Sequence, residues 1–226
     1  MKRSFVLWLS MAMVVATPPV AALDMAIGGA RFDVPASSLK EMRFRTTMRQ
    51  QYDFSCGSAA VATLLTYHYG QRFTEQQVFE QMYARGDQAR IRREGFSLLD
   101  MQAFLAAHGY RADGFQLPLE KLSEAGLPAI VLLSDKGYQH FVVVKGIAGD
   151  RVLLGDPARG TRALTRAAFH AAWVGKLLFV IHGDTHAGSF NASAEWRTAP
   201  AAPLAAVFAR DGLGAATMAK LGPGDF

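Results

Sequence analysis

The chain has 226 residues, of which 50% are hydrophobic and 19% are charged, and it contains one cysteine. This length allows one domain with a sizeable core, and the hydrophobic content excludes a wholly disordered chain. One cysteine excludes an intramolecular disulfide and the cysteine-rich metal modules. The net charge of +5 would suit a nucleic-acid partner, so the position of the charges matters.

The first 22 residues have the layout of a secretory signal peptide. Lys2 and Arg3 precede an apolar run over residues 5–16, and small residues end the segment at Ala22. The run is shorter than the roughly 20 residues of a membrane span; an uncleaved inner-membrane anchor is the alternative. Cleavage after Ala22 removes two positive charges and leaves 204 residues with a net charge of +3. We therefore expect a periplasmic protein with no nucleic-acid partner and no stable membrane span after cleavage.

Composition divides the remaining chain into three parts. Residues 23–44 form a lead-in segment with a strand-like run at 31–34. Residues 45–183 carry the periodic runs of a folded domain. Residues 184–226 are rich in Ala, Gly and Pro and predict a flexible tail, in which only 204–210 favours a helical turn.

Helical periodicity dominates the first half of the predicted domain. One helix is predicted to begin just after Cys56, a second at a capping box that starts with Thr74, and a third at Ser97. A short fourth helix is expected over 118–124. The residues on the periodic faces of the first three are Ala59, Ala60, Val61, Leu64, Leu65, His68, Val78, Phe79, Met82, Leu98, Met101, Phe104 and Leu105.

Strand-like runs dominate the second half. Aliphatic or β-branched residues bounded by Gly, Asp and Pro predict strands at 128–133, 141–144, 151–154 and 177–181, with helical spacing over 165–173. Helices followed by strands predict an α+β fold, with N-terminal helices packed on one side of a C-terminal antiparallel sheet.

Cys56 stands at the predicted N-terminus of the first helix. The positive end of a helix dipole favours a thiolate and would lower the pKa of a cysteine there. A thiolate is a nucleophile, whereas a neutral thiol is not. The alternative is that Cys56 is a small buried hydrophobic residue.

His140 and Asp156 are predicted to lie at matching ends of one hairpin. They are each eight residues from Ala148, near the expected turn, so the two side chains should be close. A carboxylate beside a histidine fixes its tautomer and supports its imidazolium form, as a Cys–His pair requires. Taken singly, His140 would be an ordinary strand-edge histidine and Asp156 a turn acid preceding Pro157.

A glutamine upstream of the cysteine completes the candidate site. Gln50 or Gln51 could donate a side-chain hydrogen bond to the oxyanion of a tetrahedral intermediate, beside the backbone N–H of Cys56. Removing one such donor costs about 10²–10³ in rate. Alone, either glutamine would be an ordinary surface residue.

These segments together resemble the peptidase C39 family. Residues 50–65, the strand that starts at His140, and residues 155–157 carry the resemblance, which covers about residues 45–182. Members of this family are papain-like cysteine proteases, known mainly as the leader-cleaving domains of bacteriocin exporters. The resemblance therefore implies a papain-like fold.

The resemblance also assigns roles to individual residues. It implies Cys56 as the nucleophile, His140 as the general base and Asp156 as the acid that orients it. In the family, the oxyanion glutamine lies six residues before the cysteine, which selects Gln50. The family's Gln-x-Asp pattern aligns instead with residues 51–53, so Gln51 is the alternative.

The implied activity is that of a cysteine endopeptidase that needs no cofactor and cuts exported polypeptides after small residues such as Gly-Gly. Exporter domains of the family are fused to membrane spans and an ATPase, which this sequence does not contain. A signal peptide resembles instead the standalone exported members, one group of which accompanies bacterial functional-amyloid secretion. The implied substrate is then an exported amyloid or secretion-system protein. The alternatives are a non-catalytic papain-like peptide-binding or chaperone module that assists secretion, and acyl transfer through the same thioester.

Other motifs carry less weight. The remaining histidines lack the spacing of a metal site, so no metal is expected. The arginines between 85 and 93 are expected in a solvated loop, with substrate docking as the alternative. The pair Gly28 and Gly29 could be a self-processing site, although linker glycines explain it more simply.

Overall fold

The computed structural model describes residues 22–27, 30–35, 38–135, 137–182 and 190–199. The chain divides into two compact units at Ser38. In the first unit, β1 (Ala22–Ile27) pairs antiparallel with β2 (Ala30–Pro35), which confirms the strand predicted at 31–34. The predicted signal peptide, apart from Ala22, lies outside the described residues. So do the Gly28–Gly29 pair and the predicted helical turn at 204–210.

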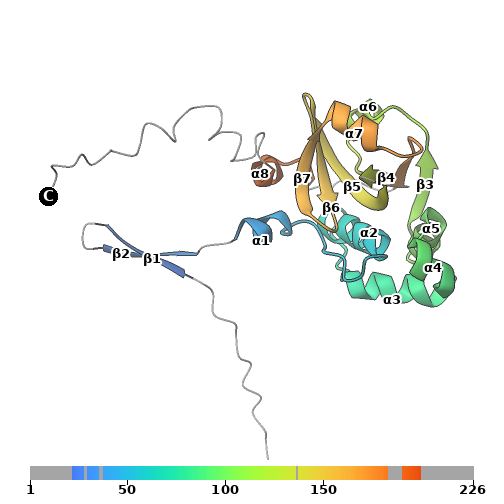
Figure 1. Cartoon of the computed structure of the whole chain (residues 1–226), viewed down its shortest axis with the longest axis horizontal. Helices are drawn as coiled ribbons and strands as arrows, with labels where there is room; N and C mark the ends of the chain where they lie inside the picture. Colours follow the sequence, from blue (N-terminus) through green and yellow to red (C-terminus); the bar gives the residue numbers. More distant parts are fainter. Residues whose placement is uncertain (1–21, 28–29, 36–37, 136, 183–189, 200–226) are drawn as a thin grey trace, which may run out of the picture. The chain divides into compact units, whose positions relative to one another are not determined.

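The second unit is built on a six-stranded antiparallel sheet with the strand order β3-β8-β4-β5-β6-β7 (Figure 1). The four predicted strands are present, and β3 and β7 are additional. The strands are β3 (Arg111–Phe115), β4 (Ala129–Asp135), β5 (Tyr138–Ala148), β6 (Arg151–Asp156), β7 (Gly160–Thr165) and β8 (Leu178–His182).

The predicted helices are also present, and their starts follow the predicted caps. Thr74 and Ser97 each form a capping box with the residue three positions later. The helices of this unit are α1 (Leu39–Arg43), α2 (Cys56–Tyr67), α3 (Glu75–Arg85), α4 (Gln88–Glu94), α5 (Leu98–Ala107), α6 (Glu120–Ala125), α7 (Arg166–Ala172) and α8 (Ser193–Thr198).

Helix α2 is the centre of the larger core. Its residues from Cys56 to Leu65 are all buried, and it packs against α3, α5 and β5. Small residues such as Ala59 and Ala60 let neighbouring elements approach this helix closely, which an amphipathic surface helix would not need. The first residue of α2 is therefore held firmly against the sheet.

The N-terminal helices α2, α3 and α5 share one core with the sheet, as the predicted α+β fold requires, but α6 and α7 pack on its other face, which the prediction did not include. The second face carries its own core, in which Phe169 and Trp173 near α7 and Leu122 from α6 pack on the strands. The apolar runs of β4 and β5 are continuous rather than alternating, and a strand of that kind must bury both faces.

Two further predictions are wrong. The arginine-rich run near residue 90 is not a solvated loop but contains α4, because Asp87 caps its N-terminus and Arg90 pairs with Asp100 at 2.9 Å. The predicted loose tail begins too early, because residues 190–199 include α8. Glu195 of this helix is buried and pairs with Lys145 of β5 at 2.7 Å.

Candidate active site

Cys56 connects the start of α2 to the strand β5. Its Sγ accepts a hydrogen bond from the backbone N–H of Phe141 at 3.4 Å, a contact between residues 85 positions apart in the sequence. Only 6% of Cys56 is exposed. The sulfur therefore lies beside the residue that follows His140.

His140 and Asp156 are brought together by the pairing of β5 with β6. Ala148 pairs with Arg151, so the turn is formed by Gly149 and Asp150, and a register shift after Val144 adjusts the far end of the hairpin. There, the Nε2 atom of His140 lies 3.2 Å from Oδ2 of Asp156. The proximity predicted from the hairpin is confirmed.

Asp156 is buried, yet it is well supplied with hydrogen-bond donors. Its Oδ2 also accepts from Arg162 at 2.9 Å, and its Oδ1 accepts from the backbone N–H groups of Ala158 and Arg159. Burial alone would raise the pKa of this carboxyl. The hydrogen bond with His140 and the charge of Arg162 outweigh burial and hold the pKa at about 2.

This carboxylate determines which nitrogen of His140 remains available. An ionised carboxylate only accepts hydrogen bonds, so Nε2 carries the hydrogen, and Nδ1 of the neutral ring is an acceptor. Nδ1 is buried and has no hydrogen-bond partner among the described residues. Nδ1 of His140 is thus a basic nitrogen with no hydrogen bond. The next residue, Phe141, binds the sulfur of Cys56 through its backbone N–H.

The thiol of Cys56 differs from the prediction. Burial raises its pKa, and the backbone N–H groups of Phe141, Gly57 and Cys56 itself offset this effect only in part. The predicted lowering by the helix N-terminus is therefore wrong for the resting site, because desolvation outweighs the favourable N–H groups. A thiolate at this position needs a proton acceptor close by.

The two candidate glutamines lie in different environments. Gln50 is half-buried, and its backbone N–H donates to the carbonyl of Pro157 at 3.1 Å, which ties it to the end of β6. Its side-chain amide donates to the carbonyls of Tyr52 and Asp53, at 3.0 and 3.4 Å. Gln51 is exposed. The structure thus places Gln50, and not Gln51, against the strand that carries Asp156.

Tyr138 belongs to the site and was missed by sequence reasoning. Its ring stacks on that of His140 with centroids 5.5 Å apart, and its hydroxyl donates to the carbonyl of Asp53 at 3.0 Å. It therefore joins β5 to the loop that precedes Cys56. The signal was available, because residues two apart in a strand share a face.

A second missed residue is Glu75, at the start of α3. It is buried and accepts a hydrogen bond from Ser58 of α2 at 2.9 Å. Burial raises its pKa, and the hydroxyls of Ser55 and Ser58 partly oppose this shift. Glu75 thereby supports the first turn of α2, the turn that begins with Cys56.

The residues described by the structure contain no cluster of three or more His, Cys, Asp or Glu side chains that could hold a metal ion. Nor does any helix in those ranges have the length and apolar character needed to cross a membrane.

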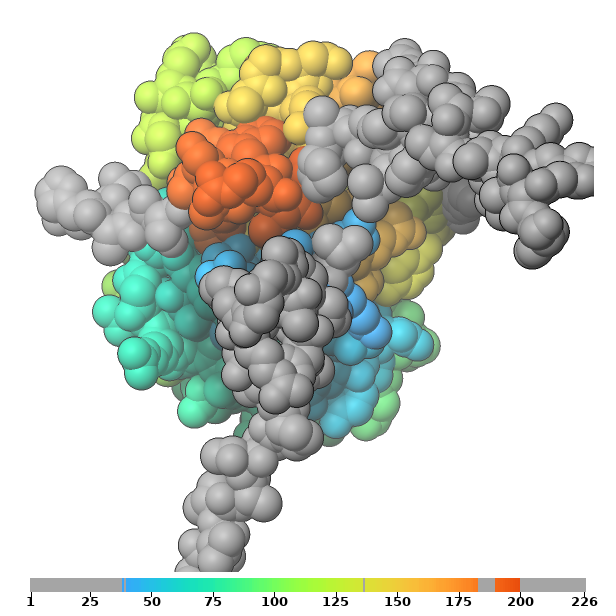
Figure 2. All heavy atoms as spheres, turned by 90° about the vertical axis from the view of Figure 1, so that its left-hand side faces the viewer, coloured from blue at the N-terminus to red at the C-terminus, as the bar shows by residue number. Residues whose placement is uncertain are grey.

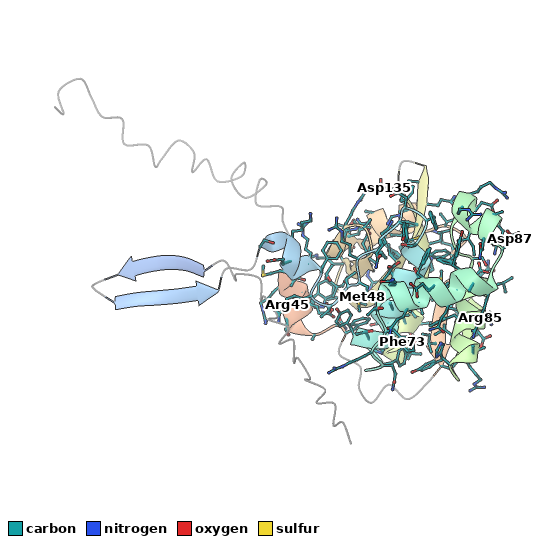
Figure 3. The ribbon with its side chains drawn as sticks, turned by 90° about the horizontal axis from the view of Figure 1, so that it is seen from below. Arg45, Met48, Phe73, Arg85, Asp87 and Asp135 are labelled. Carbon is teal, nitrogen blue, oxygen red and sulfur yellow. The ribbon has the colours of Figure 1, made fainter. Side chains whose placement is uncertain are left out.

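The segment between α1 and α2 leads from α1 toward the helices of this unit, as the labelled residues Arg45 and Met48 show in Figure 3.

A buried cysteine at a helix N-terminus, a histidine on the adjacent strand and an aspartate bound to it are the groups that cysteine peptidases with a papain-like fold bring together. Comparison with known families supports this class, because the model of the Peptidase C39 family matches residues 45–185. The chain belongs to the peptidase C39 family.

Individual relatives agree with this assignment. The chain is 39% identical over 154 residues to "Probable functional amyloid protease FapD" of Pseudomonas aeruginosa, with 68% of each protein covered. It is 32% identical to "Lactococcin-G-processing and transport ATP-binding protein LagD" of Lactococcus lactis subsp. lactis, over 58% of this chain and 18% of the other. The fold resembles the peptidase domain of Streptococcus ComA, with a TM-score of 0.51, 21% identity, and coverage of 62% of this chain and 98% of the other. These relatives favour a peptidase over a non-catalytic module.

Proposed function

We propose that this cysteine peptidase is a periplasmic endopeptidase that processes exported polypeptides, with Cys56, His140 and Asp156 as its catalytic residues. One observation carries the assignment of the residues. His140 is held by Asp156 through Nε2 at 3.2 Å, while its Nδ1 is free and its neighbour Phe141 binds the sulfur of Cys56. These contacts support a Cys–His pair, because the free imidazole nitrogen belongs to the residue next to the one that binds the sulfur.

The reaction follows from these positions. Nδ1 of His140 accepts the proton of the Cys56 thiol, and the sulfur attacks the carbonyl carbon of the scissile peptide bond. The imidazolium, stabilised by Asp156, returns the proton to the nitrogen of the leaving amine as the carbon–nitrogen bond breaks. Water then attacks the thioester, again assisted by His140, and releases the acid and the free thiol.

The oxyanion is proposed to bind the backbone N–H of Cys56 and the side-chain amide of Gln50. In the structure, the Gln50 amide donates to the carbonyls of Tyr52 and Asp53, so it must turn from these carbonyls to bind the oxyanion. Gln51 is a poorer candidate because it is exposed, whereas Gln50 is half-buried and is tied to Pro157 through its backbone N–H.

The substrate class is proposed from the family and the relatives. The C39 resemblance implies cleavage after small residues such as Gly-Gly, and the FapD relative is described as a functional amyloid protease. We therefore infer that the substrates are exported amyloid or secretion-system proteins. A signal peptide over residues 1–22 and a peptidase domain over 45–183 accord with a function outside the cytoplasm.

The proposal is tested by co-expressing the protein with the exported proteins encoded next to it and comparing their processing with that in a Cys56→Ser variant. We expect defined amino-terminal fragments with the wild type and only precursors with the variant. Mass spectrometry of the fragments gives the residues on either side of each cut. Identical precursor and fragment patterns in the two strains would sink the protease proposal for those substrates.

The Gly28–Gly29 pair is tested in the same strains. The intact mass of the wild-type protein is compared with that of Cys56→Ala. A shorter wild-type chain that starts after residue 29 would show self-processing, and an identical N-terminus in both proteins would exclude it.

A further inference from the structure

A recess of about 200 Å³ lies beside His140, on the face of the sheet that α7 covers. Walls are supplied by the ends of β4 and β5, by β7 and by α7. Asp135, labelled in Figure 3, marks the end of β4 at its rim. The side chains that line the recess include those of Leu133, His140, Arg162, Leu164, Ala168 and Ala172.

The recess exists because α7 contributes methyl groups where larger side chains would fill the space. Ala168, at an exposed position, and the half-buried Ala172 line the recess, together with Leu133 and Leu164. An apolar cavity of about 150 Å³ is large enough to bind benzene. The recess can therefore hold an aliphatic side chain of leucine size.

The charges at its rim are already paired. Arg162 binds Asp156 at 2.9 Å, and Asp135 binds Arg159 at 2.7 Å. An ionised side chain entering the recess would lose its hydration without gaining a free counter-charge, which is costly. The recess therefore favours an uncharged occupant.

The position of His140 shows which part of a substrate reaches the recess. In the proposed mechanism, His140 protonates the nitrogen of the leaving amine, so the residue that carries this nitrogen must lie against the imidazole. We propose that the recess is the subsite for the first side chain on the amine side of the cut, and that it accepts an uncharged aliphatic side chain. This inference rests on the proposed function and adds a second specificity element to it.

The experiment fills the recess and compares two peptides. The peptides are identical except for leucine or glycine as the first residue after the cut. The variants Ala168→Leu and Ala172→Leu place a larger side chain in the recess. The matched controls are Ala167→Leu and Ala171→Leu, which change the same residue type on the same helix at positions that do not line the recess.

For the wild type, we expect a kcat/KM at least 10-fold higher for the leucine peptide than for the glycine peptide, the usual effect of filling an apolar pocket. The filled variants should reduce this ratio to near one, while the controls keep it. A loss of folded protein would lower both rates equally and leave the ratio unchanged, so the ratio reports the subsite itself.

Three outcomes count against the inference. It is overturned if the filled variants keep the wild-type ratio, or if a peptide with lysine or glutamate at this position is cleaved as fast as the leucine peptide. It is also overturned if wild type shows no preference between leucine and glycine. In each case cleavage itself continues and the proposed function stands, whereas failure of the wild type to cleave any peptide counts against the proposed function.

Discussion

Two buried pairs of polar side chains lie on β5, five residues apart, and their surroundings differ. His140 pairs with Asp156 at 3.2 Å, with side chains 2% and 0% exposed, and Lys145 pairs with Glu195 at 2.7 Å, with side chains 0% and 6% exposed. The first pair joins the two strands of one hairpin, β5 and β6, whereas the second joins β5 to α8, 50 positions further along the sequence. They differ in how fully their polar atoms are satisfied.

The Lys145 pair is saturated. Its Nζ donates to the carbonyl and hydroxyl of Thr46 and to Glu195, at 2.6 to 2.8 Å, and lies 4.5 Å from the centre of the Phe190 ring. Burial lowers the pKa of Lys145 to about 8, although Glu195 opposes this shift. Figure 2 shows the segment 190–199, in orange-red, on the surface next to the residues that follow α1, in blue. The hydroxyl of Thr46 donates to Glu195 between these two segments.

The His140 pair is left open at one atom, the buried Nδ1. A buried polar atom without a partner costs stability, whereas a saturated pair holds two segments together at a lower net cost. In the proposed function, the pair with the open atom serves the chemistry and the closed pair serves the architecture. The following predictions test this division.

The largest expected effect is on catalysis. His140→Ala should lower kcat for a cleaved peptide by about 10⁴-fold or more, because it removes the proton acceptor of Cys56. Its midpoint of thermal unfolding should change by only a few degrees. Lys145→Met serves as the reverse control. We expect it to lower the unfolding temperature clearly and to leave kcat nearly unchanged. A large loss of kcat in both variants would contradict the division.

The next effect is on stability. Glu195→Ala leaves the Lys145 charge buried without its partner and should cost about 3–5 kcal/mol in the free energy of unfolding, measured in urea. The double variant Lys145→Met with Glu195→Leu should cost less than Glu195→Ala alone, because no charge is then stranded. If the double variant is as unstable as the sum of its single changes, the pair does not act as a closed unit.

A smaller effect is expected on the free energy of unfolding at acidic pH. The folded-state pKa of Asp156 is about 2, below the ordinary value of 3.8, so its contribution is present above pH 4 and is lost as the pH falls toward 2. This loss amounts to about 2 kcal/mol. In Asp156→Asn, the free energy of unfolding should fall less steeply between pH 4 and 2. Parallel curves for the two proteins would show that Asp156 is not the group that titrates.

The smallest effect is expected on the access of reagents to Cys56, through Tyr138. Tyr138→Phe keeps the ring on His140 but removes the hydroxyl that binds the Asp53 carbonyl. One hydrogen bond of this kind contributes about 0.5–1 kcal/mol, so its loss should make it easier for the loop before Cys56 to move away from β5. Iodoacetamide should then label Cys56 about two- to five-fold faster. Labelling at the wild-type rate would show that the tie to Asp53 does not restrict access.

Local patterns were enough to predict much of this fold and site. The capping boxes at Thr74 and Ser97 and the apolar faces of α2, α3 and α5 depend on neighbours within a few residues, so the sequence shows them directly. The approach of His140 to Asp156 was also predictable, because one hairpin creates it.

The missed features depend on distant partners. β3 has little strand character of its own and forms because β8 offers it an edge. Helix α8 lies in an Ala-rich stretch and is fixed by the bond of Glu195 to Lys145, which is 50 residues away. The raised pKa of Cys56 likewise follows from its burial between α2 and β5, which no local pattern records.

The tie between Thr46 and Glu195 has a consequence for the order of folding. It closes a loop of 149 residues, and contacts of such high sequence separation form late because the entropy of loop closure must first be overcome. As the chain is made from its N-terminus, Lys145 has no counter-charge until α8 follows. The two ends of the enzyme domain are thus joined after the sheet, so the domain becomes fully stable only when its final described helix is in place.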